Sequence, residues 1–258
     1  MSKSILEYRF LKGDLFMSNF ANQVVLITEG SSNIGTTCAL SYARAGAIVI
    51  LSGKNTQTGT DLVAGIKEDG GQAHFYKADL AQSEEVIALM NYINQNYGKL
   101  DLAINNTGLL GASSQELATD PTAEWAVTID TSLKSMWLCM QYEKTLIQEG
   151  INKAIVNMTT LPETFTQAVA GMHLAYKKSV ECFTRNFAAL YHKEGIRVNT
   201  IDLSSTGMIS LWQGASASTG TTSGPTATSQ QVTDLAMWLT TGTSPFVTGT
   251  LLAVPMAA

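Results

Sequence analysis

Residues 23–35 have the sequence QVVLITEGSSNIG, in which an apolar, β-branched run leads into a turn of small polar residues and glycine. The run from Gln23 to Thr28 is typical of a buried strand, and the stretch from about Gly35 to Ala45 is typical of a helix that Gly46 ends. A tight strand-to-helix turn presents backbone N–H groups and the positive end of the helix dipole to a pyrophosphate. The segment therefore predicts a nucleotide-binding βα unit at the start of the fold.

The same alternation of short apolar runs and longer amphipathic stretches continues along the chain. Strands are expected at 47–52, 73–77, 100–105, 154–159, 197–202 and 250–254, and helices at 58–69, 83–97 (with Ser83 as N-cap), 125–149 and 174–194. This pattern indicates an α/β class: a single doubly wound, Rossmann-type domain whose central, mainly parallel sheet has helices on both faces. Ligands of such sheets bind outside the carboxyl ends of the strands, so the segments ending at Thr28, Ser52, Asn105 and Thr159 are expected to line the site.

Two segments depart from this alternation. Residues 1–16 precede a natural start at Met17 and are expected to be an N-terminal extension to a domain that spans 17–258. Residues 204–231 are rich in Ser, Thr and Gly and contain little to bury, which predicts a flexible loop. Because long loops in compact domains tend to be functional, a lid over the substrate cleft is favoured over a surface linker.

Composition excludes several classes of function. The 258 residues suffice for one large domain, and the net charge of −5 comes with scattered Lys and Arg rather than a basic patch, which argues against nucleic-acid or membrane partners. The sequence contains no transmembrane-length apolar run, and its start lacks the apolar core of a signal peptide. Cys38, Cys139 and Cys182 have no metal-ligand spacing, which predicts reduced thiols, no metal site and a cytoplasmic location.

Several ordered motifs accompany the first turn. They are Thr28-Glu-Gly-Ser-Ser-Asn-Ile-Gly35, Lys54, Asp79, Asn105-Asn-Thr-Gly108, Ile196-Arg-Val-Asn-Thr200 and Val247-Thr-Gly249. Together they resemble the short-chain dehydrogenase/reductase family, whose first turn is T-G-x-x-x-G-I-G and whose fourth strand is followed by N-N-A-G. The resemblance covers the chain from about Phe20 onward. It implies a nicotinamide dinucleotide as cofactor and a small carbonyl or alcohol as substrate.

The resemblance assigns a set of cofactor-binding positions. They are Gly30, Ser32, Asn33, Ile34, Gly35, Lys54, Asp79, Leu80, Asn106, Gly108 and Lys177. Glu29 and Asn33 replace the first two glycines of the family's turn; Asn tolerates positive φ, so the turn is still expected to form. The charge of Glu29 opposes an anion unless the side chain points to solvent. Lys54, with no Asp at the end of its strand, favours NADP(H) over NAD(H), although a solvated surface lysine is the alternative.

The family's catalytic positions are altered. Its members use a Tyr acid/base, a Lys four residues later, a Ser thirteen residues before the Tyr, and an Asn in the preceding helix. The lysine is retained as Lys177, but the other three positions hold His173, Thr160 and Ser132. Tyr176 does not replace the missing tyrosine, because adjacent residues of a helix point about 100° apart.

Two interpretations of these changes remain open. In the first, His173 is the proton donor, with a pKa that Lys177 lowers, and Thr160 binds the substrate oxygen. In the second, the chain is a non-catalytic member that acts as a binding, regulatory or oligomer-partner subunit. Replacements at the nicotinamide end, such as Met208, Leu203-Ser204 and Pro255-Met-Ala257, favour the second. A Thr160/His173 pair for hydrolysis is the weakest alternative, since no acidic orienter is visible.

The resemblance also implies self-association. The helices at 125–149 and 174–194 correspond to those that pack between subunits in this family, so a homo-oligomer, a tetramer or a dimer, is expected. Apolar side chains on these helices are candidates either for that interface or for the core: Met136, Trp137, Phe183, Phe187 and Leu190.

Overall fold

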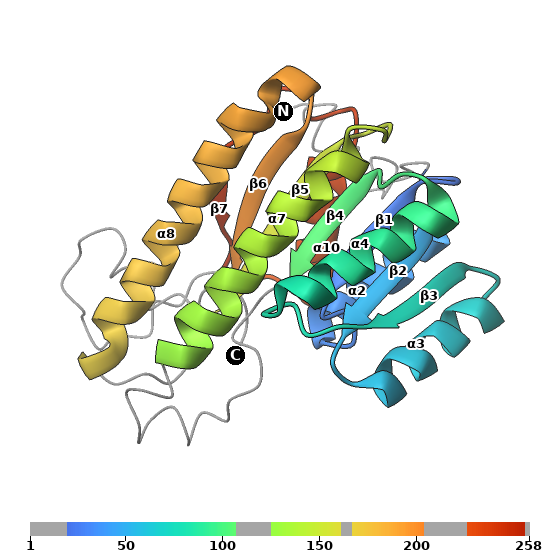
Figure 1. Cartoon of the computed structure of the whole chain (residues 1–258), viewed down its shortest axis with the longest axis horizontal. Helices are drawn as coiled ribbons and strands as arrows, with labels where there is room; N and C mark the ends of the chain where they lie inside the picture. Colours follow the sequence, from blue (N-terminus) through green and yellow to red (C-terminus); the bar gives the residue numbers. More distant parts are fainter. Residues whose placement is uncertain (1–19, 107–124, 161–166, 204–225, 256–258) are drawn as a thin grey trace, which may run out of the picture.

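A computed structural model describes residues 20–106, 125–160, 167–203 and 226–255 (Figure 1). Its centre is a seven-stranded sheet of order β3-β2-β1-β4-β5-β6-β7, in which every adjacent pair is parallel. The strands are β1 (Val24–Thr28), β2 (Ile48–Gly53), β3 (Gln72–Lys77), β4 (Leu102–Asn106), β5 (Ala154–Thr160), β6 (Arg197–Leu203) and β7 (Leu251–Ala253). The strand order reverses between β1 and β4, which makes that point the topological switch of the sheet.

Helices cover both faces of the sheet. They are α2 (Asn33–Arg44), α3 (Thr56–Glu68), α4 (Ser83–Tyr97), α7 (Lys134–Ile147), α8 (Gln167–Tyr191) and α10 (Ser229–Thr240), with a π-helix at Ala126–Leu133 and a 3-10 turn at His192–Glu194. Buried side chains of α4, α7 and α8 share one core cluster, on the face toward the viewer in Figure 1, and those of α2, α3 and α10 share the other. The predicted doubly wound α/β fold is confirmed.

Three details of the sequence prediction are wrong. The loop expected at 204–231 ends earlier, because Thr228 and Gln231 form a capping box that starts α10. The N-cap of α4 is Gln82 rather than Ser83. The helix expected at 125–149 divides into the π-helix and α7. The N-terminal extension and the rest of the expected lid lie outside the described residues.

The apolar residues proposed for an interface fall into different environments. Met136 and Phe187 belong to the core and Phe183 is packed against it, whereas Trp137 and Leu190 are exposed. No helix within the described residues is both long and apolar enough to cross a membrane.

The first turn of α2 packs closely against the backbone of the turn that follows β1. A Cβ on Gly35 would lie 2.6 Å from the carbonyl oxygen of Glu29 and 2.9 Å from the backbone of Gly30. A side chain at Gly35 would therefore push the first turn of the helix away from the end of β1.

We predict that Gly35→Ala lowers the free energy of unfolding by about 2 kcal/mol or more, because the added methyl group meets backbone atoms that cannot move aside. Urea denaturation followed by circular dichroism measures the change. Gly65→Ala is the matched control: Gly65 is exposed in α3 with open space around it. This control should raise stability by up to about 1 kcal/mol. An unchanged midpoint for Gly35→Ala would contradict the prediction.

Candidate functional site

The carboxyl ends of β1 and β4 are joined by hydrogen bonds at the switch point. The backbone N–H of Asn106 donates to the Thr28 hydroxyl at 2.9 Å. The side-chain amide of Asn106 donates to the Ser32 hydroxyl at 2.7 Å and to the carbonyl of Glu29 at 3.3 Å. The turn that the sequence assigns to a pyrophosphate is thus fixed against the neighbouring strand.

The helix that follows this turn is capped by Ser32, whose hydroxyl accepts the backbone N–H of Gly35 at 3.1 Å. The turn forms, as expected, but Asn33 is the first residue of α2 and does not use the positive φ that it tolerates. The left-handed residue of the turn is instead Glu29, with φ 46°. A non-glycine residue pays a conformational cost there, which explains why glycine suits this position. Ile34 and Leu80, also assigned to the cofactor, have their side chains in the core.

Three charged residues meet at the ends of β1, β2 and β3. The Lys54 ammonium pairs with the Asp79 carboxylate at 3.0 Å, and the two side chains are 50% and 31% exposed. Glu29 is half-buried and does not point to solvent: its Oε2 lies 3.5 Å from where a Cβ on Gly53 would be. Burial raises the pKa of the Glu29 carboxyl, Lys54 lowers it and Asp79 raises it. The cluster of these three residues therefore holds two carboxylates and one ammonium.

The retained lysine lies at the other end of the same edge. Lys177, on α8, places its ammonium 2.9 Å from Oδ2 of Asp202 on β6, and both side chains are almost fully buried. Oδ1 of Asp202 accepts the Thr159 hydroxyl at 3.2 Å. Burial of such a pair is tolerated only when the charges are matched and hydrogen-bonded.

The structure describes the remaining predicted catalytic positions to different extents. Ser132 is fully buried at the end of the π-helix, and Tyr176 is buried in the core, which agrees with its exclusion as a replacement acid. Thr160 ends β5 and His173 lies four residues before Lys177 in α8. The side chains of Thr160 and His173, and all of Gly108 and Met208, lie outside the described part of the chain.

Comparison with known proteins identifies the family. A family model described as Enoyl-(Acyl carrier protein) reductase matches residues 29–255. The chain is 35% identical to the 3beta-hydroxysteroid dehydrogenase of Mediterraneibacter gnavus over 73% of its own length and 68% of the relative's. The chain belongs to the short-chain dehydrogenase/reductase family. Another member, the cyclohexanol dehydrogenase of an Acinetobacter strain, is 34% identical over 72% of this chain and 74% of its own.

A solved structure supports the fold assignment. The hydroxysteroid dehydrogenase of Escherichia coli superposes with a TM-score of 0.74, covering 93% of this chain and 98% of that one at 22% identity. Membership of the short-chain dehydrogenase/reductase family implies a nicotinamide dinucleotide at the carboxyl edge of the sheet. The residues at the turn fit this group, since Ser32 caps a helix N-terminus there and Gly35 permits close backbone approach. Within the described residues, no group of three or more His, Cys, Asp or Glu is arranged to hold a metal ion.

Sequence reasoning missed two acidic residues of this short-chain dehydrogenase/reductase. One is Asp202, and the available signal was a carboxylate near the carboxyl end of a predicted strand. The other is Glu143 of α7, which is fully buried and accepts a hydrogen bond from the Asn105 amide at 3.1 Å. Asn105 also donates to Asn157 at 3.2 Å, so the amides link β4 and β5 beneath the site. Burial raises the pKa of Glu143 to about 8, against the lowering effect of Asn105.

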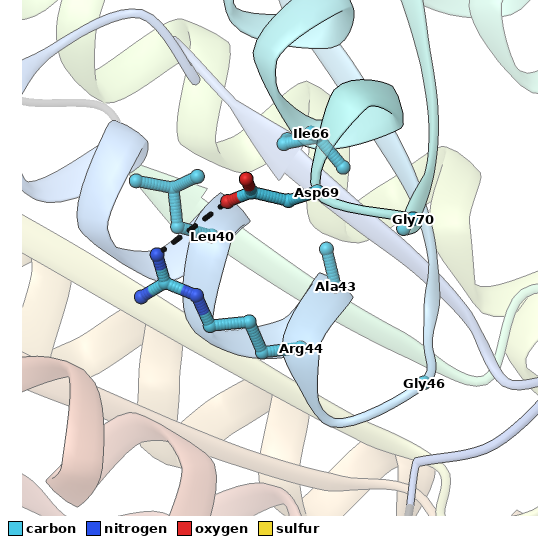
Figure 2. A pocket seen from close by; sticks show the side chains of 8 residues that line it. Leu40, Ala43, Arg44, Gly46, Ile66, Asp69 and Gly70 are labelled. Carbon is cyan, nitrogen blue, oxygen red and sulfur yellow. Dashed lines mark ion pairs between the residues drawn. The ribbon is translucent and has the colours of Figure 1, made fainter.

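A pocket lies at the amino ends of the strands, away from the cofactor site at their carboxyl ends. It has a volume of about 310 Å³ and is lined by α2, the end of α3 and the turns before β2 and β3, among them Leu40, Ile66, Gly46 and Gly70. Figure 2 shows the Arg44 and Asp69 side chains facing each other there, at 3.7 Å. Because this pocket lies at the amino ends of the strands, it is not the candidate functional site.

We predict that Glu143 makes stability fall as pH rises. Its folded pKa of about 8 exceeds the ordinary value of 4.5, so its stabilising contribution is complete below pH 4.5 and is lost as pH rises to about 8. Glu143→Gln keeps the acceptor for Asn105 and removes the titration. Its stability relative to the wild type should therefore increase by roughly 3 kcal/mol between pH 5 and pH 8. Urea midpoints at four pH values measure this; parallel curves for the two proteins would contradict it.

Proposed function

We propose that this chain is a nicotinamide-dinucleotide-dependent oxidoreductase that interconverts a secondary alcohol and a ketone on a carbocyclic ring. The observation that supports it best is Lys177, which is kept at the family's position on α8 and is buried beside the ends of β5 and β6. The substrate class follows from the names of the two relatives, a 3beta-hydroxysteroid dehydrogenase and a cyclohexanol dehydrogenase. Both names describe a hydroxyl group on a ring.

In this proposal each residue at the nicotinamide end of the site has a separate role. The dinucleotide, when bound, supplies or accepts the hydride. His173 moves the proton of the substrate hydroxyl, Thr160 offers a hydroxyl to the substrate oxygen, and Ser132 supports the relay from the preceding helix. Lys177 orients the dinucleotide, and its charge is balanced by Asp202. Assembly into a dimer or tetramer and a cytoplasmic location stay predictions of the sequence.

We predict that the purified protein oxidises cyclohexanol or a related ring alcohol with NAD⁺ or NADP⁺. His173→Ala should reduce the rate by about 100-fold or more, because positioned proton transfer contributes at least that factor. His192→Ala is the matched control, since His192 is exposed on the 3-10 turn after α8. Absorbance at the reduced-nicotinamide band measures turnover. No turnover, or equal rates in the wild type and His173→Ala, would contradict the proposal.

Two observations favour a second candidate, a non-catalytic dinucleotide-binding subunit. The Lys177 ammonium is in a buried ion pair with Asp202 and so is already committed to a carboxylate of the protein. Glu29 likewise brings negative charge to the edge that would bind the pyrophosphate.

For the second candidate, the expected result is binding of the dinucleotide without hydride transfer. Calorimetric titration measures the binding, and the ring-alcohol assay measures transfer. Activity should then appear only after His173→Tyr is combined with Thr160→Ser, because a phenol and a serine hydroxyl restore the family's proton-transfer pair. Robust turnover by the wild-type protein would exclude this candidate.

A further inference from the structure

The side chain of Glu29 leaves the turn in a direction that its backbone dictates. Glu29 follows β1 directly, with φ 46°, and its carbonyl accepts hydrogen bonds from the Ser32 N–H at 3.1 Å and the Asn106 amide at 3.3 Å. The next N–H, of Gly30, donates to the carbonyl of Ser52 on β2 at 3.1 Å. With both flanks of the residue fixed, the side chain extends toward the end of β2.

The carboxylate of Glu29 comes to rest beside Gly53, the last residue of β2. Its Oε2 lies at ordinary contact distance from the position of a Cβ on Gly53, while Oε1 is buried without a hydrogen-bond partner among the described residues. A buried acceptor that lacks a donor is costly, and it is satisfied when a ligand brings one. An acidic group from the turn after β1 thus lies at the end of β2.

This end of β2 is where a dinucleotide fold recognises the adenosine ribose. An acidic residue about 20 positions after the glycine turn accepts the ribose 2′-hydroxyl in NAD-binding proteins, whereas a basic group accommodates the 2′-phosphate of NADP. This chain has Gly53 and Lys54 there, and no acid. The geometry points to Glu29 as the residue that accepts the ribose hydroxyl and excludes the 2′-phosphate, which makes the chain selective for NAD(H). This inference rests on the proposed function and replaces the NADP(H) preference that Lys54 suggested.

The surrounding charges support exclusion of the phosphate. Lys54 is held by Asp79, which is itself fixed: its Oδ1 accepts the Ala81 N–H at 3.1 Å and its N–H donates to Glu85 at 2.7 Å. A 2′-phosphate would meet two carboxylates and one neutralised lysine. A 2′-hydroxyl brings the donor that Glu29 lacks and adds no charge.

The experiment uses fragments of the dinucleotide that lack the nicotinamide ring, so the residues that would contact that ring do not affect the measured binding. Calorimetric titration of the full chain with ADP-ribose and with 2′-phospho-ADP-ribose gives the ratio of the two dissociation constants. We expect the wild type to favour ADP-ribose by about tenfold or more, and Glu29→Gln to reduce that ratio by about tenfold. Glu68→Gln is the control, since it removes the same charge from an exposed position on α3.

Two further variants separate the effect of the Glu29 charge from a loss of folding and from an effect of Lys54. Glu29→Gly removes the charge and also relieves the positive φ, so it should fold at least as stably as the wild type and shift the ratio in the same direction. Lys54→Ala should leave the preference for ADP-ribose in place. A wild-type preference for the 2′-phosphorylated fragment, or a ratio that neither Glu29 variant changes, overturns the inference while the proposed function stands. Failure of the wild type to bind either fragment overturns both.

Discussion

The side chain of Asn106 holds the functional edge of this protein together. At the switch point β1 and β4 are neighbours, but their paired residues end with Ile27 and Ile104, so the last residues of the two strands lie beyond this ladder. Asn106 bridges this gap by donating to Ser32 and to the carbonyl of Glu29, while its own N–H is bound by Thr28. The turn, the start of α2 and the end of β4 are therefore one hydrogen-bonded unit.

The conformation of Glu29 is a consequence of that unit. Hydrogen bonds on either side of the residue fix it with a left-handed backbone, a conformation that costs energy for glutamate. The same constraint directs the carboxylate toward Gly53 instead of into water. A glutamate in place of the family's glycine would be harmless at an exposed position. At this position it changes the charge of the dinucleotide site.

The protein also buries ionisable side chains near the carboxyl ends of β5 and β6, at Lys177 and Asp202, and on α7, at Glu143. Lys177 and Asp202 neutralise each other at 2.9 Å, whereas Glu143 has no cation beside it among the described residues and depends on the amide of Asn105. Desolvation raises the pKa of Glu143, so that carboxyl tends to stay neutral and stabilises the fold in that form. The buried carboxyl groups of Asp202 and Glu143 thus have different partners, an ammonium for Asp202 and a neutral amide for Glu143.

The amino-acid sequence by itself determined the α/β class, the parallel sheet and the location of the nucleotide turn, since these follow from local periodicity, glycine positions and ordered motifs. The resemblance of the sequence to the family also located Lys177 on the predicted helix at 174–194, and spacing along that helix argued against Tyr176 as a replacement acid. Only the tertiary structure decided that Glu29 turns inward, that Lys54 pairs with Asp79, and that Asp202 meets Lys177. These contacts join segments that are far apart in the chain, and their geometry is set by strand order and register, which no local pattern encodes.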